Sequence, residues 1–256
     1  MKIVIVGNGM VGYKFCEKLR KKASADQVEI VVYGDEILPA YDRVHLSEYF
    51  ENQESDKLLM ADASWYTNND IVLKTGELVT IIDTAEKSVI THKGNTEPYD
   101  YLVLATGSSA MVPPIKGVEK KGVFVYRKIE DLDQIIEFGK GIKRAAVLGG
   151  GLLGLEAAKA LMDMNLKTQV VEFADKLMPR QLDQTGSDLL KSKIESLGIE
   201  VLLGKNTKNI VGNGKLSKLE FTDGSELQTE MLVISCGIIP RDELAESAGL
   251  VKGAMT

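Results

Sequence analysis

The sequence is poor in the residues that most often carry metal or thiol chemistry. Of its 256 residues, only Cys16 and Cys236 are cysteines and only His45 and His92 are histidines. The cysteines lie far apart and form no Cys-x-x-Cys, which argues against a redox-active disulfide, an iron–sulfur site or a zinc site. No Ser-His-Asp motif is present either. We therefore expect no bound metal, and this cysteine usage suits a reducing cytoplasm.

The sequence also lacks a long apolar run and an excess of positive charge. No run approaches the roughly 18 apolar residues that a membrane-spanning helix needs. The apolar stretch at residues 2–6 is too short for the core of a signal peptide, and Gly7 interrupts it. The formal net charge is -6, which disfavours binding to phosphate-rich nucleic acid. We expect a cytoplasmic protein with no membrane or nucleic-acid partner.

What the sequence does have is two glycine-rich segments of one plan. IVGNGMVG at residues 5–12 and VLGGGLLGLE at 147–156 each follow an apolar run and open a helical pattern. In such a turn the first glycine makes a bend, the second lets the backbone approach a pyrophosphate, and the third lets helix and strand pack. The free N–H groups of the helix hold the phosphates. We predict two dinucleotide-binding turns, the first made of Gly7, Gly9, Met10 and Gly12, and the second of Gly149, Gly151, Leu152, Leu153 and Gly154.

Acidic residues follow both turns at the end of the next predicted strand. A carboxylate at this position bonds a ribose hydroxyl of the dinucleotide. VVYGDE places Asp35 and Glu36 there after the first turn, and which of them faces the ribose stays open. VVEF places Glu172 there after the second turn, where a carboxylate repels a 2′-phosphate and so favours NADH over NADPH. The alternative is that these acids are ordinary exposed charges.

The remaining pattern alternates strands with helices, which is typical of parallel sheets covered by helices. The proline-rich stretch at 111–118 reads as a linker between two repeats of the plan. We predict an α/β fold with two Rossmann-like domains, each a three-layer arrangement of a parallel sheet with an antiparallel β-meander. We expect residues 1–110, with 240–256 as a partial return segment, to form the first domain and residues 111–239 to form the second. Two dinucleotides must meet when a nicotinamide passes a hydride to a flavin.

Together the motifs resemble the FAD- and NAD(P)H-dependent family of pyridine nucleotide-disulfide oxidoreductases. The segments that carry the likeness are the two turns, AYDRVHLSEYF (40–50), YLVLATGSSAMVPPIKG (101–117), EFADKLMPRQLD (172–183) and SCGIIPRDELAESAGL (235–250). Within the family, GNGMVG, AYDRVHLS and GGGLLGLEAA are most similar to the N-terminal flavoprotein part of the nitrite reductase large subunit. The resemblance implies an oxidoreductase that passes a hydride from NADH to FAD and electrons onward to an acceptor.

The resemblance also implies roles for single residues. The first turn would bind the FAD pyrophosphate, with Asp35 on the ribose and Arg43 beside the phosphates and the flavin. Val79 would meet the adenine through its backbone. Three further residues would pass close to FAD where the chain returns to its domain, namely Ala105, Thr106 and Gly107. For Arg43 a surface loop arginine, and for Val79 a plain strand residue, are the alternatives.

On the second domain, the resemblance implies that the glycine turn and Glu172 hold NADH. Glu156 would lie near the nicotinamide as the catalytic residue, and Gly237 would line the same pocket. The alternative for Glu156 is an acid in the first helical turn that the helix dipole favours. Several relatives carry a lysine near the flavin where this sequence has Glu48, so a Lys–Glu pair is not available. His45 lies in the same stretch, and a packed loop histidine is the simpler reading.

Members of the family continue beyond the position that matches Thr256. In them a Gly-Asp segment that contacts FAD, an interface domain and, for nitrite reductase, iron–sulfur and sirohaem domains follow. We therefore expect a chain truncated before the interface domain, an acceptor domain or protein outside it, and a possible homodimer. The alternatives are a rubredoxin or ferredoxin reductase, an NADH oxidase, and a non-catalytic nucleotide-binding fragment. A non-flavin NAD dehydrogenase would leave one of the two turns unexplained.

Overall fold

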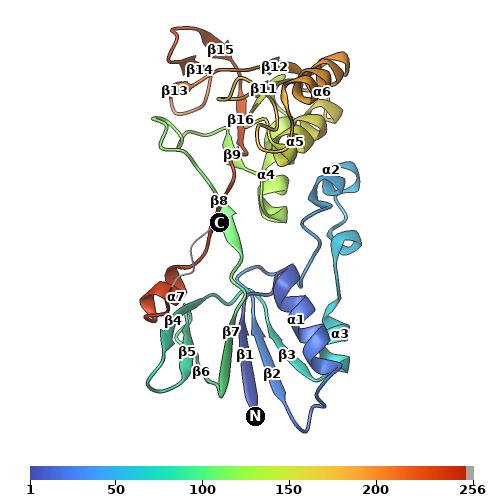
Figure 1. Cartoon of the computed structure of the whole chain (residues 1–256), viewed down its shortest axis with the longest axis vertical. Helices are drawn as coiled ribbons and strands as arrows, with labels where there is room; N and C mark the ends of the chain where they lie inside the picture. Colours follow the sequence, from blue (N-terminus) through green and yellow to red (C-terminus); the bar gives the residue numbers. More distant parts are fainter. Residues whose placement is uncertain (252–256) are drawn as a thin grey trace. The chain divides into compact units, whose positions relative to one another are not determined.

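The computed structural model describes residues 1–251, which form two compact units (Figure 1). The first unit contains residues 1–45, 54–109 and the segment from Pro240 onward, and the second contains residues 46–53 and 110–239. Residues 46–53 differ from the expected boundaries, because they cluster with the second unit. There the Tyr49 hydroxyl donates to Asp133 at 2.7 Å, and Phe50 stacks on Tyr126. Such long-range packing leaves no local sign in the sequence.

The first unit is built on a four-stranded parallel sheet. Its order is β3 (Ile71–Lys74), β2 (Glu29–Tyr33), β1 (Lys2–Val6) and β7 (Tyr101–Leu104). Because side chains alternate across a strand, Ile3 and Ile5 pack with Tyr13 of α1 (Met10–Arg20), whereas Val4 and Val6 pack on the opposite face. The face that carries Val4 and Val6 is covered by an antiparallel meander of β4 (Val79–Asp83), β5 (Ser88–Thr91) and β6 (Thr96–Pro98).

Short elements complete both units. They are η1 (Leu46–Glu48), α2 (Tyr49–Asn52), η2 (Ser55–Leu58), α3 (Ala63–Asn68) and α7 (Glu243–Ser247). Of these, η1 and α2 belong to the second unit and the others to the first. The chain passes between the units along two short paired strands, β8 (Ser108–Ala110) and β17 (Ile238–Pro240). Leu244 and Ala248 pack against the meander side of the first sheet. The return segment is therefore part of the packed first unit.

The second unit repeats the plan with a five-stranded parallel sheet. Its order is β12 (Glu200–Leu202), β11 (Lys167–Val171), β10 (Arg144–Leu148), β16 (Met231–Ile234) and β9 (Val123–Val125). Its helices are α4 (Ile129–Gly139), α5 (Leu152–Asp163) and α6 (Gln184–Ser196). An antiparallel meander of β13 (Thr207–Val211), β14 (Lys218–Phe221) and β15 (Glu226–Gln228) shares a buried core with Leu148 and Leu232.

The predicted fold class is confirmed, since both units have a parallel sheet with helices and an antiparallel meander. The structure adds β9 and α4, which were not predicted. The buried residues of α4, among them Ile129, Leu132 and Ile136, have helical spacing. That signal was present in the sequence at residues 129–139. Within residues 1–251, no helix is both long and apolar enough to cross a membrane.

Candidate functional site

The first glycine turn is shaped by backbone contacts that exclude side chains. Gly7 has a φ of +112°, and a Cβ atom on it would lie 2.1 Å from the carbonyl oxygen of Ala105. A Cβ atom on Gly12 would lie 2.0 Å from the carbonyl oxygen of Gly7. The Gly7 N–H donates to the carbonyl of Tyr33 at 2.8 Å. The first and third glycines therefore hold β1, β7 and α1 in close contact, as the motif predicts.

The second turn has the same construction in the second unit. Gly149 has a φ of +119°, and a Cβ atom there would lie 2.3 Å from the carbonyl oxygen of Ser235. A Cβ atom on Gly154 would lie 2.0 Å from the carbonyl oxygen of Gly149. Two segments of different sequence thus reach one backbone arrangement, because the same three positions lack side chains.

The middle glycine of each turn lies in open space. A Cβ atom on Gly9 or Gly151 would have no neighbour within 4 Å. These two glycines are the N-caps of α1 and α5, and neither helix has a side-chain cap or an acidic residue in its first turn. By contrast, Asp62 caps α3 and Asp183 caps α6. The first N–H groups of α1 and α5 are therefore left for an outside acceptor, which suits a phosphate.

Glu172 stands beside the second turn and is oriented by its own backbone surroundings. One carboxylate oxygen accepts from the Gly150 N–H at 2.5 Å, and the other accepts from the Ala174 N–H at 2.7 Å. The predicted ribose-binding acid thus lies directly against the second residue of the GGG sequence.

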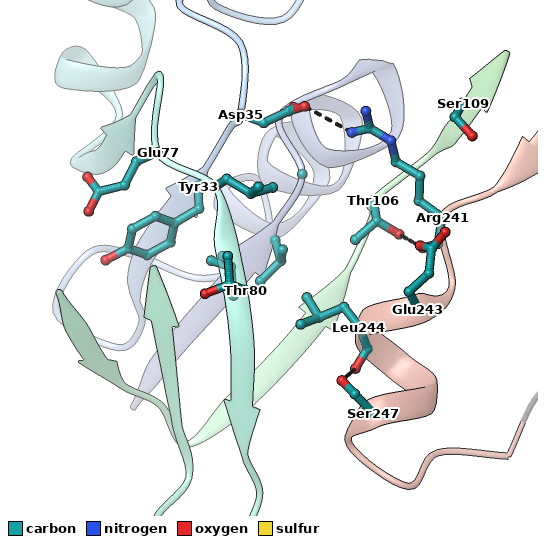
Figure 2. Close-up of a pocket in the computed structure, with 14 residues that line it drawn as sticks. Tyr33, Asp35, Glu77, Thr80, Thr106, Ser109, Arg241, Glu243, Leu244 and Ser247 are labelled. Atoms are coloured by element: carbon teal, nitrogen blue, oxygen red, sulfur yellow. Dashed lines mark hydrogen bonds and ion pairs between the residues drawn. The ribbon is translucent and has the colours of Figure 1, made fainter. Parts of the chain in front are cut away.

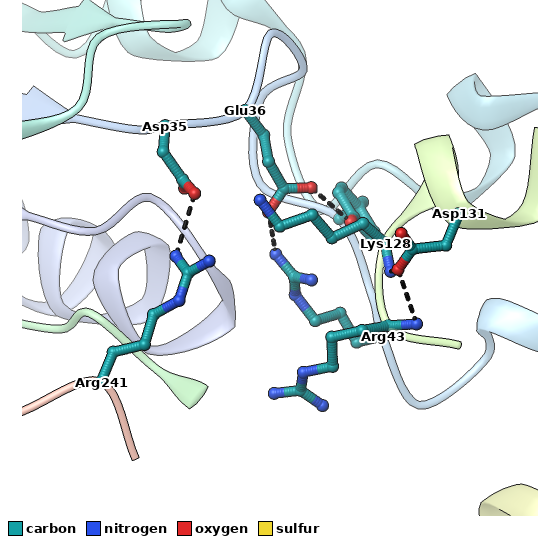
Figure 3. Close-up of polar contacts among 8 residues, drawn as sticks. Asp35, Glu36, Arg43, Lys128, Asp131 and Arg241 are labelled. Carbon is teal, nitrogen blue, oxygen red and sulfur yellow. Dashed lines mark hydrogen bonds and ion pairs between the residues drawn. The ribbon is translucent and has the colours of Figure 1, made fainter. Parts of the chain in front are cut away.

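Asp35 and Glu36 differ in what surrounds them (Figure 3). Glu36 accepts hydrogen bonds from the Tyr41 hydroxyl, at 2.6 Å, and from the guanidinium of Arg43. Asp35 forms an ion pair of 2.9 Å with Arg241. Asp35 is also the one of the two acids that lines a cavity in the first unit. Of the two acids, Asp35 is therefore the one at the cavity, and its role at the ribose stays a prediction.

The cavity lies within the first unit and encloses about 570 Å³ (Figure 2). Val6 and Gly7 from the first turn, Tyr33 and Asp35 from the end of β2, and Thr106 from the end of β7 contribute to its wall. The rest of the wall comes from the meander and from the return segment, through Glu77, Leu78, Val79, Thr80, Ser109, Arg241, Glu243, Leu244 and Ser247. This volume is in the range of small-molecule cofactor sites.

Of the other residues predicted for the first site, some line the cavity and others do not. Val79 and Thr106 line the cavity, and the Thr106 hydroxyl donates to the carbonyl of Arg241 at 2.6 Å. The carbonyl oxygen of Ala105 lies against Gly7. The Gly107 carbonyl accepts from the Arg241 N–H at 3.0 Å. Arg43 is not part of the cavity wall.

Arg43 instead lies over the ring of Tyr41, with 4.7 Å from its central carbon to the ring centre. Its ion pair with Glu36 holds it on that side. The cation that lines the cavity is Arg241. No local motif marks Arg241, and the only available signal was its place in the expected return segment.

In the second unit, Glu156 lies in the second turn of α5, because that helix begins at Leu152. It is therefore not the first-turn acid of the simpler reading. Burial and, next, the charge of Glu156 raise the pKa of the Tyr126 phenol. Gly237 has a φ of +119°, and its carbonyl accepts from the Met111 N–H at 2.9 Å.

A family model described as pyridine nucleotide-disulphide oxidoreductase matches residues 1–254. The chain belongs to this family. Membership confirms the resemblance drawn from the motifs and implies an oxidoreductase that uses FAD and NAD(P)H. The word disulphide in the description does not extend to this chain's cysteines, since Cys16 and Cys236 are both free.

Relatives at the level of single proteins agree with the family. The NADH nitrite reductase large subunit of Escherichia coli (strain K12) is 45% identical over 98% of this chain and 30% of its own length. The assimilatory nitrate reductase electron transfer subunit of Bacillus subtilis (strain 168) is 40% identical over 97% of this chain and 32% of its own length. The chain thus spans about a third of these relatives.

Among solved structures, the NAD-dependent persulfide reductase from A. fulgidus superposes with a TM-score of 0.93 and 30% sequence identity. The match covers 99% of this chain and 49% of that one. The fold of this chain is therefore shared with that reductase.

Proposed function

We propose that this chain is the part of a nitrite reductase large subunit that transfers electrons from NADH to FAD. The first unit would bind FAD and the second NADH. The observation that carries the proposal is the repeated turn, in which an open middle glycine precedes an uncapped helix and an acid stands at the end of the second strand. Two such turns in one chain fit a reaction between two dinucleotides.

In the first unit, the N–H groups at the start of α1 would hold the FAD pyrophosphate. The open space at Gly9 lets a phosphate approach the backbone, and no acid in the first turn of α1 opposes its charge. Asp35 would accept from the adenosine ribose, and Val79 would lie beside the adenine. Thr106 lies on the same cavity wall, where the chain returns from β7.

In the second unit, Glu172 would select NADH over NADPH. Its two oxygens are held by the N–H groups of Gly150 and Ala174, so the carboxylate is already oriented before a ligand arrives. An ionised carboxylate can accept from the 2′- and 3′-hydroxyls of a ribose, but it repels a 2′-phosphate. The open position at Gly151 gives the NADH pyrophosphate the same access that Gly9 gives in the first unit.

FAD, when bound, would supply the chemistry that takes two electrons from NADH and passes them on singly. The protein's part would be to bind both dinucleotides, with Glu156 and Gly237 on the nicotinamide side, and to exclude water. The acceptor would be an iron–sulfur or sirohaem domain or protein outside these 256 residues. The naming of the B. subtilis relative as an electron transfer subunit supports this last step.

The test is a titration of the purified chain with FAD, followed by anaerobic addition of NADH, read by visible flavin absorbance. We expect FAD to bind and NADH to bleach it. Absence of FAD binding, or bound FAD that NADH leaves unchanged, would contradict the proposal.

Two matched variants, Gly9→Ala and Gly151→Ala, assign the units. Neither new Cβ atom meets a neighbour, so both variants should fold. Gly9→Ala should weaken FAD binding and Gly151→Ala should weaken NADH binding, each by roughly tenfold, or about 1.4 kcal/mol. A loss of FAD binding in Gly151→Ala alone would reverse the assignment of the units.

A further inference from the structure

We infer that Arg241 is the cation that binds the phosphates of FAD, and that it does so while it orients Asp35. The inference rests on the proposed function of the first unit. It assigns to the return segment a role that the resemblance gave to Arg43, and it is drawn from the geometry and charge of the cavity wall.

Arg241 is held firmly at the cavity by its backbone. Its N–H donates to the carbonyl of Gly107 at 3.0 Å, and its own carbonyl accepts from the Thr106 hydroxyl at 2.6 Å. Both partners directly follow β7, the strand beside β1 and its glycine turn. With its backbone bound on both sides, Arg241 extends its side chain to Asp35 at 2.9 Å (Figure 2).

The cavity wall has more acidic than basic residues, so phosphates bound there would require a cation. Among the residues that form this wall, Asp35, Glu77 and Glu243 are acidic and Arg241 is the one basic residue. Hydrogen bonds, above all from Asn95, hold the pKa of Glu77 below its usual value, so this carboxylate stays charged. A pyrophosphate that carries two negative charges would meet a wall with more acidic than basic residues. Helix α1 contributes only partial charge at its N-terminus.

One guanidinium can serve both groups at once. It carries five N–H donors in a planar fork, and one terminal nitrogen, Nη1, donates to Asp35 at 2.9 Å. The other donors of the fork would serve a phosphate oxygen, and Asp35 would stand beside the ribose. Arg241 would then link the acid and the phosphates on one wall of the cavity.

The position of Arg241 couples FAD binding to the return segment. Arg241 precedes α7, whose Leu244 packs in the buried cluster that contains Val79 and Val89 of the meander. A phosphate bound by Arg241 would therefore stabilise the segment that closes this side of the cavity. We expect bound FAD to slow proteolysis and amide exchange at residues 240–251, and to do so less in a variant without the guanidinium.

The experiment compares Arg241→Gln with Lys22→Gln, a variant with the same change of charge at an exposed position outside the cavity. Binding of FAD, ADP and adenosine is measured for each variant and for the unaltered chain by fluorescence or calorimetric titration. Arg241→Gln should raise the Kd for FAD and ADP by roughly tenfold or more. Lys22→Gln should leave all three unchanged, and Arg241→Lys should restore part of the loss.

Adenosine separates the phosphate role from a role through Asp35 alone, because it has the ribose but no phosphate. Its affinity should fall clearly less than that of ADP in Arg241→Gln, because only the orientation of Asp35 is disturbed. Equal losses for adenosine and ADP, or unchanged binding of FAD and ADP, would overturn the inference. If the unaltered chain binds ADP but not FAD, the proposed function fails first, so the two failures are distinguishable. Thermal unfolding of Arg241→Gln without ligand checks that the variant is folded.

Discussion

The two glycine turns have nearly the same backbone, but their acids are held in different ways. The first glycines have φ values of +112° and +119°, and the third glycines would each place a Cβ atom 2.0 Å from a carbonyl oxygen. Yet Glu172 is oriented by N–H groups of its own turn and strand end, whereas Asp35 is paired with Arg241, 206 residues away in the sequence. Each turn is therefore formed by residues close in sequence, whereas the partner of its acid can come from a distant part of the chain.

This difference has a consequence for the two proposed sites. In the second site, Glu172 is oriented by contacts among β10, α5, β11 and the residues next to them. The first site is complete only after the chain has passed through the second unit and returned at Pro240. We therefore expect nucleotide binding by the second unit to respond mainly to substitutions within its own turn and strands. Binding by the first unit should respond also to substitutions in the return segment.

The largest effects are expected where a side chain would collide with backbone in either turn. Gly7→Ala and Gly149→Ala combine a positive φ with a Cβ atom about 2 Å from a carbonyl oxygen. Each should lower the free energy of unfolding of its own unit by about 2 to 5 kcal/mol. Amide hydrogen exchange, resolved by segment, should show faster exchange in β1 and α1 for the first variant and in β10 and α5 for the second.

Gly141→Ala is the control, because its Cβ atom would meet nothing within 4 Å and its φ is not positive. It should leave exchange in both units unchanged. If Gly7→Ala or Gly149→Ala behaved like this control, the structural equivalence of the two turns would be lost.

A smaller effect is expected from the acid of the second turn. Glu172→Gln removes the charge that would repel a 2′-phosphate and gives up one of the two hydrogen bonds from Gly150 and Ala174. The ratio of NADH to NADPH affinity should fall by roughly tenfold, or about 1.4 kcal/mol. Titrations with both nucleotides measure it, with Glu195→Gln on the exposed side of α6 as the control for charge.

An unchanged ratio in Glu172→Gln would mean that another group makes the selection. The corresponding change in the first turn, Asp35→Asn, should weaken FAD binding and leave the nicotinamide ratio as it is. A shift of that ratio by Asp35→Asn would break the proposed division of labour between the units.

The smallest effect concerns the cysteines, one in each unit. Burial raises the pKa of Cys16 to about 12. Burial and, next, the charge of Glu172 raise the pKa of Cys236 to about 11. Because the thiolate is the reactive form, both should alkylate slowly at pH 8, with Cys236, which is only half-buried, reacting before Cys16.

Mass spectrometry after timed alkylation measures the two rates, and the denatured chain provides the reference in which both react freely. Glu172→Gln should speed the reaction of Cys236, since it removes a charge that raises the pKa of that thiol, and should not alter Cys16. Rapid reaction of Cys16 in the folded chain would show that the first unit opens readily.

The sequence was a good guide wherever the determining contacts are local. The strands before both turns, the helices after them and the positions of Asp35 and Glu172 follow from patterns within about 30 residues, the length of one βαβ unit. It was a poor guide at residues 46–53, which cluster with the second unit through contacts such as Tyr49 with Asp133. The resemblance implied a role for Arg43 beside FAD; Arg43 contacts Glu36 and Tyr41 and is not among the residues of the cavity wall, so that role stays a prediction.

By itself, then, the sequence determined that this protein carries two dinucleotide-type turns, because three glycines and an apolar strand specify the bend through backbone sterics alone. Only the tertiary structure decided that Asp35, and not Glu36, faces the cavity, and that Arg241 stands beside it. The physical reason is that the hydrogen-bond and ion-pair partners of a carboxylate decide where it points. Tyr41 and Arg43 hold Glu36 by hydrogen bonds. The partner of Asp35 is Arg241, which lies in the segment that returns to the first unit at Pro240.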